Sequence, residues 1–122
     1  MHLPSAGDIV WVELDPIMGT EQAGRRPALV LTPSDYHARS RRSVVCPITS
    51  NERPWPWNVR LPKGLKTAGF VLVDQVRTID REQRMFGLIE HAPEDVIGEV
   101  LGKLASLFGM NLSTISDGPE GN

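Results

Sequence analysis

Short runs of β-forming residues, separated by turns rich in proline and glycine, fill most of this chain and leave room for one long helix near its end. Strands are expected at residues 8–14, 27–32, 43–49, 57–61, 69–79 and 85–89. Pro93 then opens a helix with anions, Glu94 and Asp95, at its positive end, and apolar residues follow at helical spacing as far as Phe108. About six strands and one terminal helix favour a mainly β fold, a small barrel or strongly bent sheet with the helix packed across it.

Three local features give sharper expectations about these elements. Pro47 removes one ladder donor from the third strand, which suggests an edge position or a bulge. Ser34 is a candidate cap for a short helical turn after the second strand. Asp74 interrupts an apolar strand and needs a partner, for which Arg77 is a candidate by spacing.

Length and composition predict one soluble domain over residues 1–110, followed by a polar, flexible tail over 111–122. The apolar runs are far too short to span a membrane, and the first residues lack the features of a signal peptide, so we expect a cytoplasmic protein without membrane association. The single cysteine, Cys46, is expected to be buried. The three histidines are scattered, which disfavours a metal site.

Charge is unevenly distributed, although the net charge is only −2. Residues 21–66 carry nine arginines and lysines against three acids, whereas residues 67–122 carry four against nine. Such a chain can present a cationic face to phosphates and remain soluble, and the alternative is a solvated surface on which charges happen to cluster.

The loop over residues 15–27 combines a glutamate, a hydroxyl and two consecutive arginines between the first two strands. A guanidinium held at the start of a strand matches phosphate oxygens with its planar fork. Glu21 paired with Arg25 or Arg26 in a surface ion pair would be the structural alternative.

A second loop, residues 50–57, carries Trp55 and Trp57 among prolines, with Arg53 and Arg60 on either side. Exposed indoles beside cations can stack unpaired bases, a use of aromatic side chains that suits single-stranded RNA. Equally, one or both rings could fold back on the core or fill a subunit interface.

Four segments, in order and with matching spacing, resemble the MazF/PemK (Kid) family of toxins from type II toxin-antitoxin systems. They are GDIVWVELDP (7–16), GTEQAGRRPALVLTP (19–33), VVCPITSN (44–51) and DQVRTID (74–80). The resemblance implies a homodimeric SH3-like β-barrel of the PemK/CcdB type. It also implies a cofactor-free, metal-independent endoribonuclease that cleaves single-stranded RNA at selected sequences, and a cognate MazE-like antitoxin whose tail binds over the RNA groove.

The resemblance assigns the family's catalytic arginine to Arg26, its active-site threonine to Thr49 and its loop glutamate to Glu21. The position that is serine or histidine in other members is Thr20 here. These four residues form the predicted catalytic site. The predicted RNA contacts are Gln22, Arg25, Ser50, Asn51, Arg53, Trp55, Trp57, Asp74, Gln75 and Arg77.

One departure from the family bears on the mechanism. The Kid-type members are assigned an arginine and an aspartate in the later strand, and this chain has Leu72 and Asp74 at those positions. A site built on Arg26 and Thr49 therefore fits better, with Arg26 stabilising the charge on phosphorus and Glu21 as the preferred base ahead of Asp74.

Two other functions stay open from the sequence. One is a protein-directed poison like the CcdB toxins, which share the barrel but use a C-terminal helix end with a tryptophan that this chain lacks. The other is an inactive RNA-binding barrel, consistent with Thr20 and Leu72.

Overall fold

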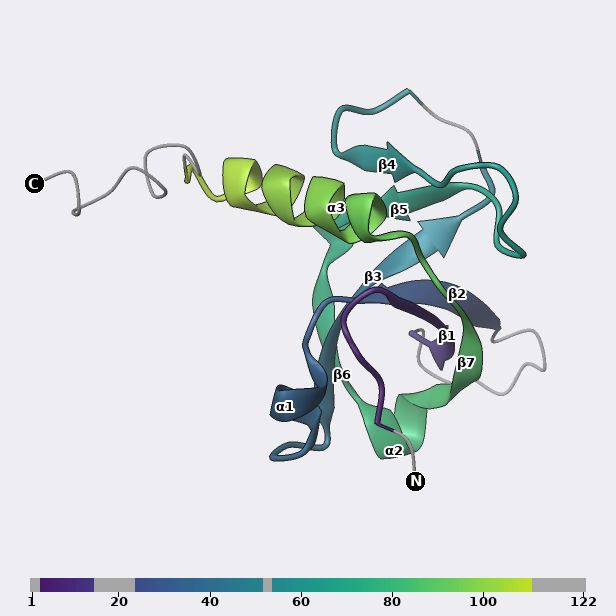
Figure 1. Cartoon of the computed structure of the whole chain (residues 1–122), viewed down its shortest axis with the longest axis vertical. Helices are drawn as coiled ribbons and strands as arrows, with labels where there is room; N and C mark the ends of the chain where they lie inside the picture. Colours follow the sequence, from purple (N-terminus) through teal and green to yellow (C-terminus); the bar gives the residue numbers. More distant parts are fainter. Residues whose placement is uncertain (1–2, 15–23, 52–53, 111–122) are drawn as a thin grey trace, which may run out of the picture.

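The computed structural model describes residues 3–14, 24–51 and 54–110. Seven antiparallel strands form a strongly bent sheet in the order β4-β5-β3-β2-β1-β7, with β6 beside β3 (Figure 1). The strands are β1 (Asp8–Glu13), β2 (Arg25–Val30), β3 (Arg42–Thr49), β4 (Asn58–Arg60), β5 (Phe70–Leu72), β6 (Arg77–Asp80) and β7 (Met85–His91). The prediction of a mainly β, barrel-like fold with a C-terminal helix is confirmed.

The run 69–79 is divided into two strands, so the prediction of a single strand there was wrong. A 3-10 turn, η1 (Val73–Gln75), separates β5 from β6. Both strands pair with β3, but the seven residues from Val71 to Arg77 lie opposite only the four from Ile48 to Val45. The turn takes up the three additional residues, because a continuous strand of this length would not fit the same neighbour.

Pro47 lies in the interior of the sheet, so the edge position suggested from the sequence was wrong. It pairs with Ala28 of β2 on one side. On the other side it lies between Val45, the last residue paired with β6, and Ile48, the first paired with β5. Proline requires an interruption of the strand pairing. That interruption is the break between β5 and β6, which lies opposite Pro47.

The helices are α1 (Ser34–His37), α2 (Arg81–Arg84) and α3 (Glu94–Leu107). Ser34 is the first residue of α1 rather than its cap; Pro33 occupies the cap position and the turn has no side-chain cap. Helix α3 follows Pro93 as predicted, with Glu94 and Asp95 in its first turn. None of the helices in the described part of the chain has the length and apolar character needed to span a membrane.

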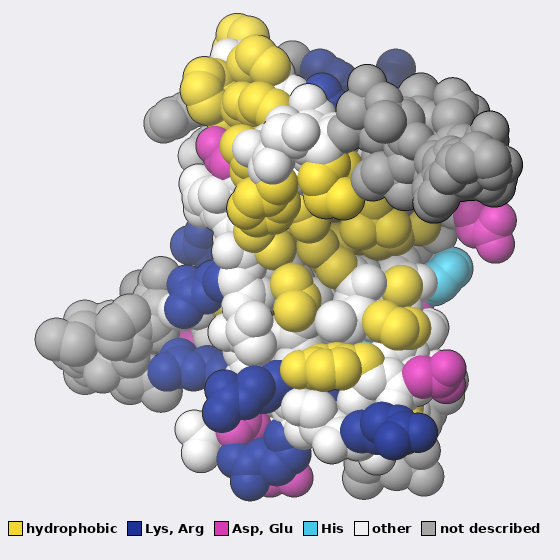
Figure 2. Space-filling view, turned by 90° about the vertical axis from the view of Figure 1, so that its left-hand side faces the viewer, with side chains coloured by type: hydrophobic (Ala, Val, Ile, Leu, Met, Phe, Trp, Pro, Cys, Tyr) yellow, Lys and Arg dark blue, Asp and Glu magenta, His cyan; other side chains and the backbone are white. Residues whose placement is uncertain are grey.

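Helix α3 packs across one end of the sheet and buries Val96 and Val100 against strand residues such as Ile9 and Val71. Cys46 belongs to this core, as predicted. The apolar stripe of α3 continues beyond the core, because the exposed fractions are 43% for Leu101, 68% for Phe108 and 50% for Met110. Figure 2 faces this end of the helix and shows hydrophobic side chains gathered across the middle of the molecule.

Candidate active site

A pocket of about 630 Å³ opens beside the C-terminal end of β3. Segments distant in sequence meet there: β1, the start of β2, the end of β3, the β4–β5 connection and β7. The lining residues are Trp11, Arg25, Arg26, Pro27, Ile48, Thr49, Ser50, Asn51, Lys66, Thr67, Ala68 and Ile89. Five of the predicted site residues, Arg25, Arg26, Thr49, Ser50 and Asn51, are therefore brought together.

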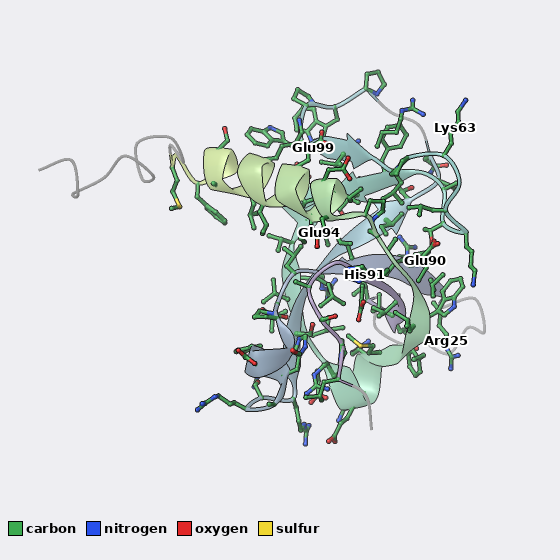
Figure 3. The ribbon with its side chains drawn as sticks, viewed as in Figure 1. Arg25, Lys63, Glu90, His91, Glu94 and Glu99 are labelled. Carbon is green, nitrogen blue, oxygen red and sulfur yellow. The ribbon has the colours of Figure 1, made fainter. Side chains whose placement is uncertain are left out.

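Both arginines are held on a strand, because β2 begins at Arg25, two residues earlier than predicted. Pairing with β1 places Arg25 opposite Glu13 and Arg26 opposite Val12. The Arg25 guanidinium lies over the Phe86 ring, 4.0 Å from its centroid, a cation–π contact that fixes its direction. Figure 3 labels Arg25 at the side of the molecule formed by β7.

Thr49 ends β3, and its hydroxyl accepts a hydrogen bond of 3.1 Å from the Asn51 N–H. Its backbone is in close contact with Gly69, where a Cβ would lie 2.0 Å from the Thr49 carbonyl oxygen. Gly69 also has a φ of +121°, which residues with a Cβ rarely adopt. The close packing of the backbone at Thr49 therefore requires glycine at position 69.

The opposite wall of the pocket is the β4–β5 connection, whose residues 66–68 line it. Glu90 of β7 accepts hydrogen bonds from the N–H groups of Lys66 (3.0 Å) and Thr67 (2.8 Å), one on each carboxylate oxygen. Desolvation opposes the charged carboxylate, but hydrogen bonds from the Lys66–Thr67 segment outweigh it and lower the pKa of Glu90.

Three further predicted residues, Trp55, Asp74 and Gln75, line a separate pocket of about 280 Å³ together with Pro54, Asn58 and Leu72. Trp55 Nε1 donates a 2.9 Å hydrogen bond to Asp74 Oδ2. The expectation that Asp74 pairs with Arg77 was wrong, because η1 turns Asp74 out of the strand to the surface, where Trp55 binds it.

Two further predicted residues that the structure describes, Trp57 and Arg77, do not line either pocket. Trp57 is half-buried before β4, where its carbonyl accepts a hydrogen bond from the Val73 N–H (3.0 Å). Arg77 is exposed on β6, opposite Val45. Thr20, Glu21, Gln22 and Arg53 lie outside the described residues. Within the described ranges, no three His, Cys, Asp or Glu side chains are grouped as metal ligands would be.

Comparisons with family models and with known proteins indicate the same family. Residues 5–108 match the model of the PemK-like, MazF-like toxin of type II toxin-antitoxin systems. The chain belongs to this family. The endoribonuclease PemK of Escherichia coli is 41% identical over 106 residues, which cover 84% of this chain and 80% of that protein.

Solved structures agree with the family assignment. A crystal structure of MazF from Deinococcus radiodurans has a TM-score of 0.81 and 44% identity, covering 90% of this chain and 100% of that one. A MazE-MazF crystal structure from the same organism has a TM-score of 0.81 and 41% identity, with the same coverage. The prediction of an endoribonuclease toxin is thereby confirmed at the level of the family.

The sequence did not indicate several residues that line the first pocket, among them Trp11, Lys66 and Thr67, nor Glu90, which binds the last two. Alternation along β1 contained the signal for Trp11, since Val10 and Val12 are buried and Trp11 between them is 42% exposed. The other three depend on the approach of β7 to the β4–β5 connection, which no local pattern indicates.

Proposed function

We propose that this chain is the toxin of a toxin-antitoxin pair and cleaves single-stranded RNA at selected sequences without a metal ion, leaving a 2′,3′-cyclic phosphate and a 5′-hydroxyl. Such cleavage of messenger RNA would inhibit translation and growth. The observation that carries the proposal is the pocket in which Arg25, Arg26, Thr49 and Lys66 meet. A pocket lined by three cationic residues and by the hydroxyl-bearing residues Thr49, Ser50 and Thr67 is suited to a phosphodiester.

In the proposed reaction the substrate supplies its own nucleophile. The 2′-hydroxyl oxygen forms a bond to the adjacent phosphorus, and the bond from phosphorus to the 5′ oxygen breaks. A base takes the proton of the 2′-hydroxyl, and a proton is delivered to the departing 5′ oxygen, so no other reactant is needed.

Arg26 has the role of stabilising the negative charge that develops on the phosphorane, and Thr49 positions a phosphate oxygen. Arg26 lines the pocket, and its pairing with Val12 fixes its backbone there, which supports this assignment. Glu21 and Thr20 keep their proposed roles as base and phosphate-positioning hydroxyl. Asp74 is the less favoured base, because its carboxylate already accepts the Trp55 hydrogen bond in the separate pocket.

The test is cleavage of a long single-stranded RNA in EDTA by the wild type, by Arg26→Ala and by Arg42→Ala. Arg42 is an exposed arginine at the other end of β3 and serves as a matched control. We expect discrete cuts with 5′-hydroxyl ends from the wild type and from Arg42→Ala, and a loss of about 100-fold or more in kcat for Arg26→Ala.

Two results would contradict the proposal. Full cleavage by Arg26→Ala at unchanged RNA affinity would exclude the role of Arg26. No cleavage of several RNAs by the wild type would favour a protein-directed toxin or an inactive RNA-binding barrel instead.

The second pocket is proposed to bind an unpaired base of the same RNA. Trp55 is 51% exposed and is held at the surface by Asp74, which leaves an indole face available for stacking. Stacking on an aromatic side chain contributes about 1–3 kcal/mol per base, so Trp55→Ala should weaken RNA binding while Trp55→Phe retains most of it. An unchanged affinity of Trp55→Ala would remove this pocket from the proposal.

Two protein partners complete the proposed function. The MazE-MazF complex of the Deinococcus relative supports a cognate antitoxin, and the basic pocket favours an acidic, partly apolar antitoxin segment over the RNA groove. The exposed apolar end of α3 supports a homodimer. The cytoplasm, where messenger RNA is translated, is the proposed location.

A further inference from the structure

The connection between β4 and β5 forms one wall of the first pocket although it has no helix or strand of its own. Its two ends are joined by the hydrogen bond from Leu61 N to Gly69 O (2.8 Å), and Leu65 packs on the core. Segments with so few internal bonds open easily unless other contacts hold them. The pocket-lining residues 66–68 therefore need an attachment from elsewhere in the fold.

Glu90 provides that attachment from β7. Its two carboxylate oxygens accept the N–H groups of two consecutive residues, Lys66 at 3.0 Å and Thr67 at 2.8 Å. Hydrogen bonds to an ionised acceptor are about twice as strong as neutral ones, and two in parallel also fix the orientation of the peptide. In Figure 3 Glu90 lies on β7 between the loop that carries Lys63 and the position of Arg25.

A carboxylate beside a pocket for RNA is unfavourable in itself, because it repels phosphate. Its presence is explained if its charge is directed to backbone N–H groups. The bonds to Glu90 also affect the reaction centre. Residues 66–68 continue into Gly69, whose backbone is packed against the Thr49 carbonyl. A shift of the connection would therefore disturb Thr49 as well as Lys66.

We propose that Glu90 is a positioning residue of the RNA site, which holds residues 66–68 at a fixed distance from Arg26 and Thr49. Lys66 then meets the RNA backbone in a preset position. This inference rests on the proposed function, since it assigns Glu90 a role in binding the RNA that the pocket takes.

Glu90→Gln tests the inference, because it keeps the shape of the side chain but offers only one acceptor oxygen and presents an amide donor to the other N–H. Glu82→Gln is the matched control, an exposed carboxylate on α2 that lies near Arg41. With a short RNA containing one cleavage site, we expect KM to rise about 10- to 100-fold in Glu90→Gln, with a smaller fall in kcat because Thr49 is disturbed less than Lys66. We expect wild-type values in Glu82→Gln.

Amide hydrogen exchange, measured on the same variants, directly reports the two hydrogen bonds from Lys66 and Thr67 to Glu90, which we call the clamp. Exchange at Lys66 and Thr67 should become faster in Glu90→Gln while the amides of β1, β2 and β3 keep their protection, which distinguishes loss of the clamp from loss of the fold. In a background of Lys66→Ala, Glu90→Gln should add little to KM, because both changes remove the same contact with RNA.

Each outcome decides the inference. Faster exchange at both amides with an unchanged KM would overturn the role of Glu90 in RNA binding and leave the proposed function intact. Fully additive effects of Glu90→Gln and Lys66→Ala would exclude action through Lys66. A wild type that cleaves no RNA would overturn the proposed function, and the role of Glu90 in it, whatever the amides show.

Discussion

Thr49 offers its side-chain hydroxyl in the pocket that Arg25 and Arg26 also line, at the point where β3 ends and the chain turns to Asn51. The hydroxyl has two uses. It accepts the Asn51 N–H and, in the proposed reaction, it can donate its own proton to a phosphate oxygen. The Arg25 guanidinium is held by the Phe86 ring, which does not itself line the pocket.

Replacing Thr49 by valine removes the hydroxyl and keeps the shape of the side chain. We expect kcat for RNA cleavage to fall about 100-fold, since a positioned donor to the reacting phosphate is lost. Loss of the bond to Asn51 should lower the free energy of unfolding by only about 1 kcal/mol. Thr49→Ser retains the hydroxyl and should keep most of the activity; equal kcat values for the valine and wild-type proteins would contradict the assignment.

Cys46 is enclosed by the core, and desolvation, with a smaller effect of Asp74, raises the pKa of its thiol to about 12. The thiol should therefore resist iodoacetamide at pH 8 in the folded protein and react once urea unfolds it. The pKa of the thiol is higher in the folded protein than in the unfolded chain, so the protonated thiol favours the folded state. This contribution to the free energy of unfolding is complete below the ordinary pKa of 9.0 and is lost as pH rises toward 12. Rapid labelling of the native protein would show that the site opens.

At the scale of elements, the contact between β5 and the end of β3 controls the site. Gly69→Ala would place a Cβ against the Thr49 carbonyl at a φ that alanine avoids, so we expect a loss of about 3 kcal/mol in the free energy of unfolding and reduced cleavage. Gly64→Ala is the matched control, with a φ of +99° and no atom within 4 Å. Gly64→Ala should lower the free energy of unfolding by only about 1–2 kcal/mol and leave RNA cleavage unchanged. Equal losses in the two variants, measured by urea unfolding, would show that backbone conformation alone is responsible.

The elements that could be predicted from the sequence are those governed by local patterns. Alternation defined β1, and Pro93 with the following apolar spacing defined α3. The division of 69–79 could not be predicted, because it follows from the register of β5 and β6 on β3 rather than from the local residues, which are uniformly β-forming.

The site could be predicted in part for the same reason. Arg26, Thr49 and Asn51 belong to segments with recognisable local motifs, and the structure brings them together. Glu90 lies in an ordinary strand, and its bonds to Lys66 and Thr67 span more than twenty residues of sequence. A contact of that range has no periodicity or motif, so only the fold could reveal it.

At the scale of the whole molecule, the exposed end of α3 is the surface that we propose for the homodimer. Phe108→Glu places a charge in this apolar patch and should weaken a homodimer at least about tenfold. Glu99→Lys is the control, since Glu99 lies on the other side of the helix from Leu101 and Phe108. Light scattering over a concentration series measures the effect, and a dimer that persists unchanged in Phe108→Glu would place the interface elsewhere.

The pairing of β1 with β7 joins the beginning of the fold to its end: Asp8 lies opposite His91, and the Ala92 N–H binds the Gly7 carbonyl. During synthesis, β1 and β2 leave the ribosome early with both arginines, but β1 has only one neighbour until β7 emerges. Long-range closure of this kind is slow compared with local folding. Glu90 is on the same late strand, so a nascent chain holds its arginines before it can hold the opposite wall of the pocket. A nascent chain that has not yet reached β7 is therefore an incomplete enzyme.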